Sequence, residues 1–338
     1  MRTQNQSLEL SHFPVMLSEI IKICSPLKSG LIVDCTFGGG GYSKEFLKIP
    51  KTKIIGFDRD KSVAIIANKL KEKFKKRFKF HQSRFSEIDN ILKESADIII
   101  FDLGLSSIQL KDFERGFSFK SKLNLDMRMG LSDISAQDVV NDFSETQLKL
   151  IFKILGEEKE ASIIAKNIVK SRLEKKITNV DELVRIIEKS KKKKFSRKIN
   201  PCTKTFQALR IFVNKEITEL IHGITNATKI LKPGGKILVV SFHSIEDKIV
   251  KYFFSNFSKS RSKPSRYLPY EDNENYVLFE KHSNKPLKPS KKEIILNNLS
   301  RSAKLRYAVR SRKSFFYPKN LFMKFKRYLD IEAMNAKI

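Results

Sequence analysis

The segment LIVDCTFGGGGYSKEFL (residues 31–47) runs from a short apolar stretch through four consecutive glycines into a sequence with helical character. Doubly wound α/β proteins bind nucleotide-like ligands at a glycine-rich turn between the first strand and the following helix. The missing Cβ atoms there let a ligand approach the backbone. The segment therefore predicts a ligand site in a doubly wound sheet.

Further apolar runs predict the other strands of this sheet. They are short, rich in β-branched and aromatic residues, and nearly continuous in apolar character, which is typical of strands buried on both faces of a parallel sheet. Segments with helical spacing separate the first three, so the predicted fold class is α/β, doubly wound and Rossmann-like. The predicted strands span residues 31–36, 53–59, 78–83, 97–103 and 236–242, with closing strands at 276–280 and 303–310.

The gap between the fourth and fifth predicted strands is far longer than one crossover needs. Several stretches within it have helical periodicity, so we predict an inserted all-helical subdomain. The expected organisation is a core of residues 1–112 that holds the glycine-rich ligand site, a helical insert of residues 113–205, and a second core part, residues 206–338, with a basic tail. The tetralysine Lys191–Lys194 is expected in a solvated loop of the insert.

The chain has 338 residues and a formal net charge of +30, from 67 Lys and Arg against 37 Asp and Glu. This charge is far beyond what solubility requires, so it favours a polyanionic partner, nucleic acid or the ribosome. The alternative explanation of the charge is that lysine is common in all proteins of the organism.

Three cysteines, Cys24, Cys35 and Cys202, are isolated in the sequence. They indicate neither a zinc site nor a disulfide framework, so no metal is expected and a reducing cytoplasm fits. No apolar run is long enough to span a membrane, and the short polar segment before His12 leaves no room for a signal peptide. We expect a cytoplasmic protein without a membrane partner.

Acidic residues at two strand ends favour S-adenosyl-L-methionine as the ligand. Asp34 ends the first strand directly before the glycines, where a carboxylate suits a ligand ammonium and would repel a pyrophosphate. Asp58 ends the second strand, where it can accept hydrogen bonds from both ribose hydroxyls. Phe85, just past the third strand, can pack on the adenine.

Each of these features has a simpler interpretation. The glycines can form a tight turn, Asp58 can cap the helix that starts near Ser62, and Phe85 can be a core residue. A dinucleotide ligand also stays open, although Ser43 occupies the place of the third glycine in G-x-G-x-x-G; no P-loop spacing occurs.

The fourth strand ends in DLGLSSIQL (residues 102–110), at the sheet edge where catalytic groups collect. Methyl transfer from a sulfonium is an in-line displacement in which the protein chiefly aligns the reacting atoms. Asp102 is the first candidate for an acidic group at the reaction, and Asp126 is the second. A role confined to holding the donor stays open for Asp102, and a structural pairing with an arginine stays open for Asp126.

Several longer motifs carry a specific resemblance over nearly the whole chain. RGFSF with LDMRMG, and TFQALRIFVN with SFHSIEDK, belong to no general nucleotide-binding pattern. Together with the motifs above they resemble, in the same order, the bacterial 16S ribosomal RNA (cytosine-N4)-methyltransferases, the RsmH or MraW family. The resembling segments are residues 12–21, 34–43, 57–60, 101–110, 115–119, 125–130, 200–217, 231–251 and 300–306.

The resemblance implies a class I S-adenosyl-L-methionine-dependent enzyme. Such an enzyme methylates the N4 amine of a decoding-centre (P-site) cytidine of 16S ribosomal RNA, within the small ribosomal subunit. Tyr42 stands where the family usually has histidine and Ile108 where it has proline, so altered donor affinity is expected more than lost activity. Residues that correspond to donor contacts of the family are Gly40, Gly41, Tyr42, Asp58, Phe85, Asp102 and Gln109, to which we add Asp34 and Gly39.

Helical spacing divides residues 203–214 into two faces. Phe206, Leu209 and Val213 form a predicted core face, and the polar residues fall on another, where RNA contact and structural hydrogen bonding are both open. The predicted RNA-binding residues are Gln207, Arg210, Asn214 and His243.

Two alternatives of other classes are a non-catalytic RNA-binding assembly factor on the same fold and an NAD-dependent dehydrogenase. Intact Asp58, Asp102 and Gln109 argue against the first, and the missing third glycine disfavours the second. For the tail beyond Arg310, an extra RNA contact and a closing helix are both open. The sequence indicates no oligomeric state.

Overall fold

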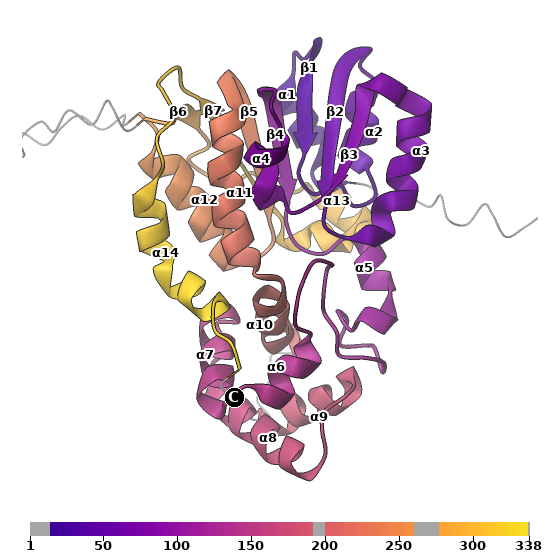
Figure 1. Ribbon diagram of the computed structural model, residues 1–338, viewed down its shortest axis with the longest axis vertical. Coiled ribbons are helices and arrows are strands. Elements are labelled where there is room, and N and C mark those ends of the chain that lie inside the picture. The colour runs from indigo at the N-terminus through magenta and orange to yellow at the C-terminus, as the bar shows by residue number, and fades with distance from the viewer. Residues whose placement is uncertain (1–13, 192–199, 260–276, 337–338) are drawn as a thin grey trace, which may run out of the picture. The chain divides into compact units, whose positions relative to one another are not determined.

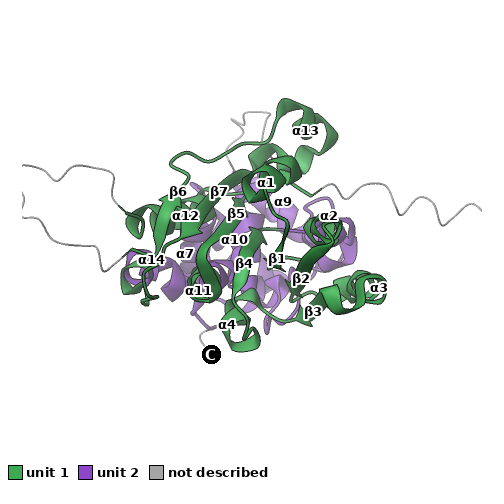
Figure 2. Ribbon diagram, turned by 90° about the horizontal axis from the view of Figure 1, so that it is seen from above, with its two compact units in different colours: residues 1–104, 221–321 green, residues 105–220, 322–338 purple. Residues whose placement is uncertain are grey.

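A computed structural model describes residues 14–191, 200–259 and 277–336. The chain divides into two compact units (Figure 2). Unit 1 comprises residues 1–104 and 221–321, and unit 2 comprises residues 105–220 and 322–338.

Unit 1 is built on a seven-stranded sheet with the strand order β3-β2-β1-β4-β5-β7-β6. The five strands β1 to β5 are parallel, whereas β7 runs antiparallel to both β5 and β6. The predicted doubly wound α/β sheet is confirmed. The strands are β1 (Ser29–Asp34), β2 (Lys51–Asp58), β3 (Phe78–Gln82), β4 (Ala96–Asp102), β5 (Leu231–Ser241), β6 (Phe279–His282) and β7 (Lys304–Arg310).

The winding of this sheet reverses between β1 and β4. Because the crossovers leave this point in opposite directions, α2 and α3 cover one face and α4 and α11 the other (Figure 2). Ligands of open α/β sheets bind at such a switch point, outside the carboxyl ends of the strands. The helices that lie within this unit are α1 (Leu17–Cys24), α2 (Gly41–Leu47), α3 (Ala64–Phe74), α4 (Ile88–Ile91), α12 (Ser244–Asn256) and α13 (Lys291–Leu296), and α11 (Glu216–Ile230) enters it from unit 2.

The core of unit 1 follows from the continuous apolar runs of its central strands. Ile32 and Val33 of β1, Ile99 and Ile100 of β4, and the β5 residue Leu238 are almost completely buried. Strands covered by helices on both faces have no solvent side, which is why these runs do not alternate with polar residues.

Unit 2 is helical and contains the segment for which an insert is predicted (Figure 1). Serines start three of its described helices, and at two of them the Ser135 and Ser144 hydroxyls accept backbone hydrogen bonds from Asp138 and Gln147, whose side chains accept in return. Its helices are α5 (Ser107–Lys111), α6 (Ala136–Asp142), α7 (Glu145–Leu155), α8 (Ala161–Glu174), α9 (Val180–Ser190) and α10 (Thr203–Asn214), joined by α14 (Lys319–Glu332), which begins in unit 1.

The compact units and the predicted domains divide the chain at different points. The units change after Gly104 and Leu220, whereas the expected domains change after residues 112 and 205. Helix α10 packs against α7, and Phe212 of α10 meets the Phe143 ring edge-on at 5.3 Å between centroids. These contacts make α10 part of the helical unit.

The solvated loop predicted for the tetralysine is wrong at its first residue. Lys191 has a side-chain exposure of only 6%, and its Nζ lies 2.5 Å from both Glu158 Oε2 and the Pro201 carbonyl oxygen. A buried cation needs such partners because desolvation would otherwise cost several kcal/mol, on the order of 3–5. Lys192–Lys194 lie outside the described residues.

Among the described residues, no helix combines the length and the apolar character that crossing a membrane requires.

Candidate active site

The four glycines form the turn between β1 and α2. Gly38 has φ 48° and Gly40 has φ 71°, a left-handed backbone that glycine adopts without strain. A Cβ atom on Gly40 would lie 2.8 Å from the Phe37 ring, and one on Gly41 would lie 2.6 Å from the Pro14 ring. At these two positions the room left by the missing side chains is taken by the protein's own rings.

Asp58 connects the end of β2 to this turn. Its Oδ2 accepts the Gly38 N–H at 2.8 Å, and its Oδ1 accepts the Asp60 N–H at 2.9 Å. Each carboxylate oxygen can accept a second hydrogen bond, so the group can still receive two ribose hydroxyls. The helix cap considered for Asp58 belongs to Asp60, whose Oδ1 accepts the Ser62 N–H at 3.0 Å.

Asp34 and Asp102 end β1 and β4, the two strands at the switch point. Asp34 is 1% exposed, and its Oδ2 accepts the Ser43 hydroxyl at 2.7 Å. The Asp102 backbone N–H donates to Thr36 Oγ1 at 2.7 Å, which ties the two strand ends together. The sequence pattern predicted both acids. It did not predict that Ser43 would bind Asp34 and Thr36 would bind the Asp102 backbone, for which the short distance of both residues from Asp34 in the sequence was the available signal.

Each of these two acids has one oxygen without a partner. Within the described residues, Asp34 Oδ1 and Asp102 Oδ1 are buried and accept no hydrogen bond. Burial raises the pKa of Asp34 to about 6, and the charge of Asp58 adds to this rise; burial raises the pKa of Asp102 to about 8, and the charge of Asp34 adds to that rise. Buried acceptors without a partner cost about 1–3 kcal/mol each, so the pair fits a ligand that carries positive charge and N–H donors.

Tyr42 is buried in the first turn of α2. Its hydroxyl donates a short hydrogen bond to the Val15 carbonyl oxygen and also lowers the pKa of the Asp102 carboxyl group. Burial, followed by the charges of Asp102 and Asp34, raises the pKa of Tyr42 well above its ordinary value. The Tyr42 side chain is therefore part of the wall beside the acid pair.

Phe85 lies just past β3, half-buried. Its ring meets Phe101 of β4 edge-on, with centroids 5.3 Å apart, and lies where a Cβ atom on Gly223 would be. Asn226 Nδ2 donates to the Ser86 carbonyl oxygen at 2.7 Å and fixes the same loop. The ring is held on the sheet with part of its surface open, and packing on an adenine stays a prediction.

Gln109 lies in unit 2, at the start of α5. Its Oε1 accepts the Ser106 N–H at 3.0 Å, and its own N–H donates to Ser106 Oγ at 3.2 Å. This reciprocal cap fixes the Gln109 side chain although Ile108, the residue before it, is not a rigid turn residue.

Asp126 is paired with an arginine, as its structural interpretation proposed. Its Oδ1 accepts Arg128 Nε at 2.6 Å, and its Oδ2 accepts Arg128 Nη2 at 3.2 Å. A catalytic role for Asp126 stays a prediction.

Asn214 holds the loop that carries this pair. Its Oδ1 accepts the Met129 N–H at 2.8 Å, and its Nδ2 donates to the Met127 carbonyl oxygen at 2.7 Å. The side chain also contacts Ser132 and the Arg210 carbonyl oxygen, and the residue is 2% exposed. The structure thus gives Asn214 a structural role.

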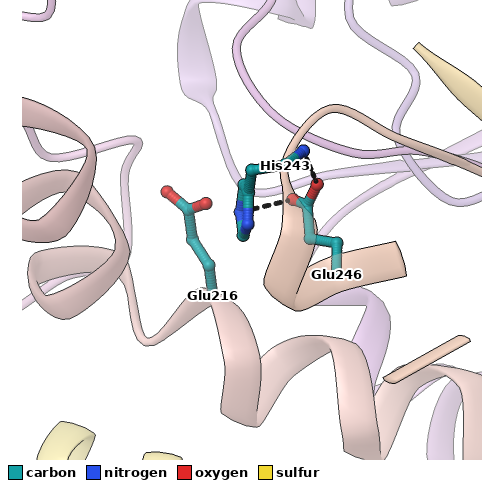
Figure 3. A group of neighbouring side chains, drawn as sticks. All are labelled: Glu216, His243 and Glu246. Atoms are coloured by element: carbon teal, nitrogen blue, oxygen red, sulfur yellow. Dashed lines mark hydrogen bonds and ion pairs between the residues drawn. The ribbon is translucent and has the colours of Figure 1, made fainter. Parts of the chain in front are cut away.

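The other predicted RNA contacts differ in their surroundings. Arg210 makes a two-point ion pair with Glu216, at 2.8 and 2.9 Å. Gln207 is half-buried on α10. Before α12 of unit 1, His243 Nε2 lies 3.1 Å from Glu246 Oε1, and Glu246 Oε2 accepts the His243 N–H (Figure 3).

Comparison with known proteins assigns the family. The profile of the MraW methylase family matches residues 9–311. The chain belongs to the MraW methylase family. It is therefore an S-adenosylmethionine-dependent methyltransferase with a class I fold, and the resemblance noted in its motifs is confirmed.

Curated relatives agree over most of their length. The protein named ribosomal RNA small subunit methyltransferase H of Parvibaculum lavamentivorans is 38% identical, over 92% of this chain and 93% of its own. Proteins of the same name from Bartonella grahamii and Ehrlichia canis are 42% identical, covering 91% and 87% of this chain and 92% and 98% of their own. A solved rRNA methylase from Streptococcus thermophilus aligns with a TM-score of 0.37, 9% identity and coverage of 84% and 89%, too low a score to add to the assignment.

Proposed function

We propose that this methyltransferase transfers a methyl group from S-adenosyl-L-methionine to the exocyclic N4 amine of a decoding-centre (P-site) cytidine of 16S ribosomal RNA. The observation that carries the proposal is the similarity, over 300 residues or more, to relatives named ribosomal RNA small subunit methyltransferase H. A net charge of +30 supports a polyanionic substrate.

The chain's own residues divide the work of holding the donor. Asp58 receives the ribose hydroxyls, Phe85 packs on the adenine, and the backbone of Gly39, Gly40 and Gly41 borders the ligand. The open oxygens of Asp34 and Asp102 meet its positive charge. When bound, S-adenosyl-L-methionine supplies a methyl group on a positively charged sulfur.

The acceptor needs alignment more than a strong base. The N4 lone pair of cytosine is delocalised into the ring, so an acceptor for one amino hydrogen eases the formation of the N–C bond. After transfer the nitrogen is strongly acidic and loses its proton to water or to a nearby carboxylate. Asp102, at the end of β4, is the first candidate for this carboxylate and Asp126 the second.

The proposed setting is the small ribosomal subunit in the cytoplasm. Residues 1–112 and 206–338 form the proposed methyltransferase core, and residues 113–205 the proposed RNA-side insert. Gln207, Arg210 and His243 are retained as proposed RNA contacts. Asn214 stays a proposed RNA contact as well, and its hydrogen bonds to Met127 and Met129 shape the loop that carries Asp126 and Arg128.

The test is methylation of defined substrates. Purified protein is given methyl-labelled S-adenosyl-L-methionine with either naked 16S RNA or small subunits from cells that lack the enzyme, and methylated nucleosides are mapped by mass spectrometry. We expect one N4-methylated cytidine in the decoding centre with the wild-type protein, and none with Asp58→Ala at low donor concentration. Methylation at another atom or another RNA would refute the proposal.

A non-catalytic assembly factor is the alternative class. The buried oxygens of Asp34 and Asp102 that accept no hydrogen bond argue against this alternative. A protein that no longer bound the donor would become more stable if these carboxylates were replaced. RNA binding without any calorimetric heat of donor binding would establish this alternative instead.

A further inference from the structure

The C-terminal segment is strongly basic and begins where the family match ends. The match covers residues 9–311. Residues 312–329 contain six Lys or Arg and no Asp or Glu. All six basic side chains are exposed: Arg312, Lys313, Lys319, Lys324, Lys326 and Arg327.

Helix α14, yellow in Figure 1, fixes the second half of this segment on unit 2. At its end the buried Glu332 carboxylate accepts the N–H groups of Ile217 and Thr218 at 2.9 and 2.7 Å, and the Thr218 hydroxyl at 2.6 Å. Phe325 and Ile331 are buried along its inner side. The helix is therefore held in place before any partner binds, so binding does not include the entropy cost of ordering it.

The outer side of the same helix is cationic. Lys324 and Arg327 stand one turn apart at i and i+3, next to Met323, which is 72% exposed. Within the described residues, no ion pair occupies Lys324 or Arg327, whereas Lys326 pairs with Asp330 at 2.7 Å. An exposed ion pair of this kind contributes little to stability, so Lys326 can leave Asp330 and bind another anion.

We propose that the outer side of α14 is a phosphate-binding surface for RNA, centred on Lys324 and Arg327. Adjacent cations on a rigid helix, without acids among them, match a row of backbone phosphates. A lipid surface fits less well, because the apolar side of the helix is already buried on unit 2 and cannot enter a bilayer. This inference rests on the proposed function for RNA as the polyanion, and it assigns a contact to a segment beyond the family match.

The test is the salt dependence of RNA binding by the full chain. The affinity for a 16S RNA fragment that contains the decoding centre is measured by fluorescence anisotropy over a range of salt concentrations. The double variant Lys324→Gln/Arg327→Gln removes two exposed cations and keeps good helix formers. The control, Lys69→Gln/Lys73→Gln, removes two exposed cations at i and i+4 on α3, with the same change of net charge.

Two phosphate contacts on single-stranded RNA contribute about 1.4 to the slope of log affinity against log salt. We expect the α14 variant to lose roughly this amount and the α3 variant to keep the wild-type slope. Equal slopes in the two variants would overturn the proposal. Binding of both variants to phosphatidylserine vesicles is measured as well, and a loss of affinity seen only with the vesicles would also overturn it. Donor binding by calorimetry and methylation by the wild-type protein are measured in parallel, so that a failure of the proposed function is distinguished from a failure of this surface.

Discussion

At the scale of the residue, Asp58 performs two tasks with one carboxylate. It holds the Gly38 and Asp60 N–H groups and is placed to receive the ribose of the donor. We predict that Asp58→Ala weakens S-adenosyl-L-methionine binding by roughly 2–4 kcal/mol, because charge-assisted hydrogen bonds are lost. Isothermal titration calorimetry measures this, and thermal unfolding reports the separate effect on the turn. An unchanged donor affinity would exclude Asp58 from the site.

The Asp102 carboxyl group provides a pH test of the same site. Its pKa, raised to about 8 chiefly by burial, lies far above that of an unfolded aspartate, so the folded state favours the protonated form. Its stabilising effect is complete below the unfolded pKa and is lost as the pH rises through the folded pKa. The pKa of Asp34 lies at about 6 and that of Glu332 at about 8, so Asp102 is separated from them by comparing the wild-type protein with Asp102→Asn in the window from pH 6 to 8.

In that window Asp102→Asn is expected to lose less unfolding free energy than the wild-type protein. The difference amounts to at most about 1.4 kcal/mol per pH unit for one proton. Urea unfolding of the donor-free proteins at pH 6, 7 and 8 measures it. Parallel pH profiles for the two proteins would show that Asp102 does not titrate there.

Lys191 belongs to the core of unit 2 and not to its solvated surface. We predict that Lys191→Ser lowers the unfolding free energy by about 3 kcal/mol, because it leaves the Glu158 carboxylate buried without its cation. Lys189→Ser, at an exposed position of α9, is the matched control and should cost less than about 1 kcal/mol. Chemical denaturation of both variants decides the matter, and similar losses would contradict the burial of Lys191.

At the scale of the element, a substitution in the glycine turn destabilises the protein in two separable ways, through backbone strain and through side-chain overlap. Gly40 and Gly234 have nearly the same left-handed φ, 71° and 77°, but a Cβ atom would meet the Phe37 ring only at Gly40. Both alanine variants carry backbone strain of about 1–2 kcal/mol. We predict that Gly40→Ala lowers the unfolding free energy by a further ~1–3 kcal/mol, because its methyl group is too close to the Phe37 ring. Equal losses in unfolding experiments would mean that the Phe37 ring moves aside freely.

Sequence patterns predicted elements better than they predicted partners. Continuous apolar runs identified the buried strands, and acids at strand ends identified Asp34, Asp58 and Asp102, because both signals are local. Asn214 and Arg210 are different. In the sequence, a polar residue on a helix looks the same whether its partner is RNA or another part of the protein. Only the fold shows the internal partners, which are Met129, 85 residues away, for Asn214 and Glu216 for Arg210.

At the scale of the whole molecule, unit 2 is made from two distant pieces of the chain, residues 105–220 and 322–338. The C-terminal piece adds a carboxylate to the start of α11. We predict that Glu332→Ala lowers the unfolding free energy by about 2–4 kcal/mol, since two buried N–H groups and a hydroxyl lose their acceptor. Glu332→Gln, which keeps an acceptor oxygen, should recover part of the loss. Unfolding curves for the three proteins provide the comparison.

The Glu332 contact also has a consequence for the synthesis of the protein. Its partners, Ile217 and Thr218, are translated 115 and 114 residues before it. All seven strands of the described sheet have been translated by Arg310, yet the first turn of α11 has no acceptor from α14 until Glu332 is translated. A nascent chain can therefore complete its sheet while unit 2 is still open. A chain that stopped between Arg310 and Glu332 would contain every predicted site residue but would lack the carboxylate that completes the helical unit.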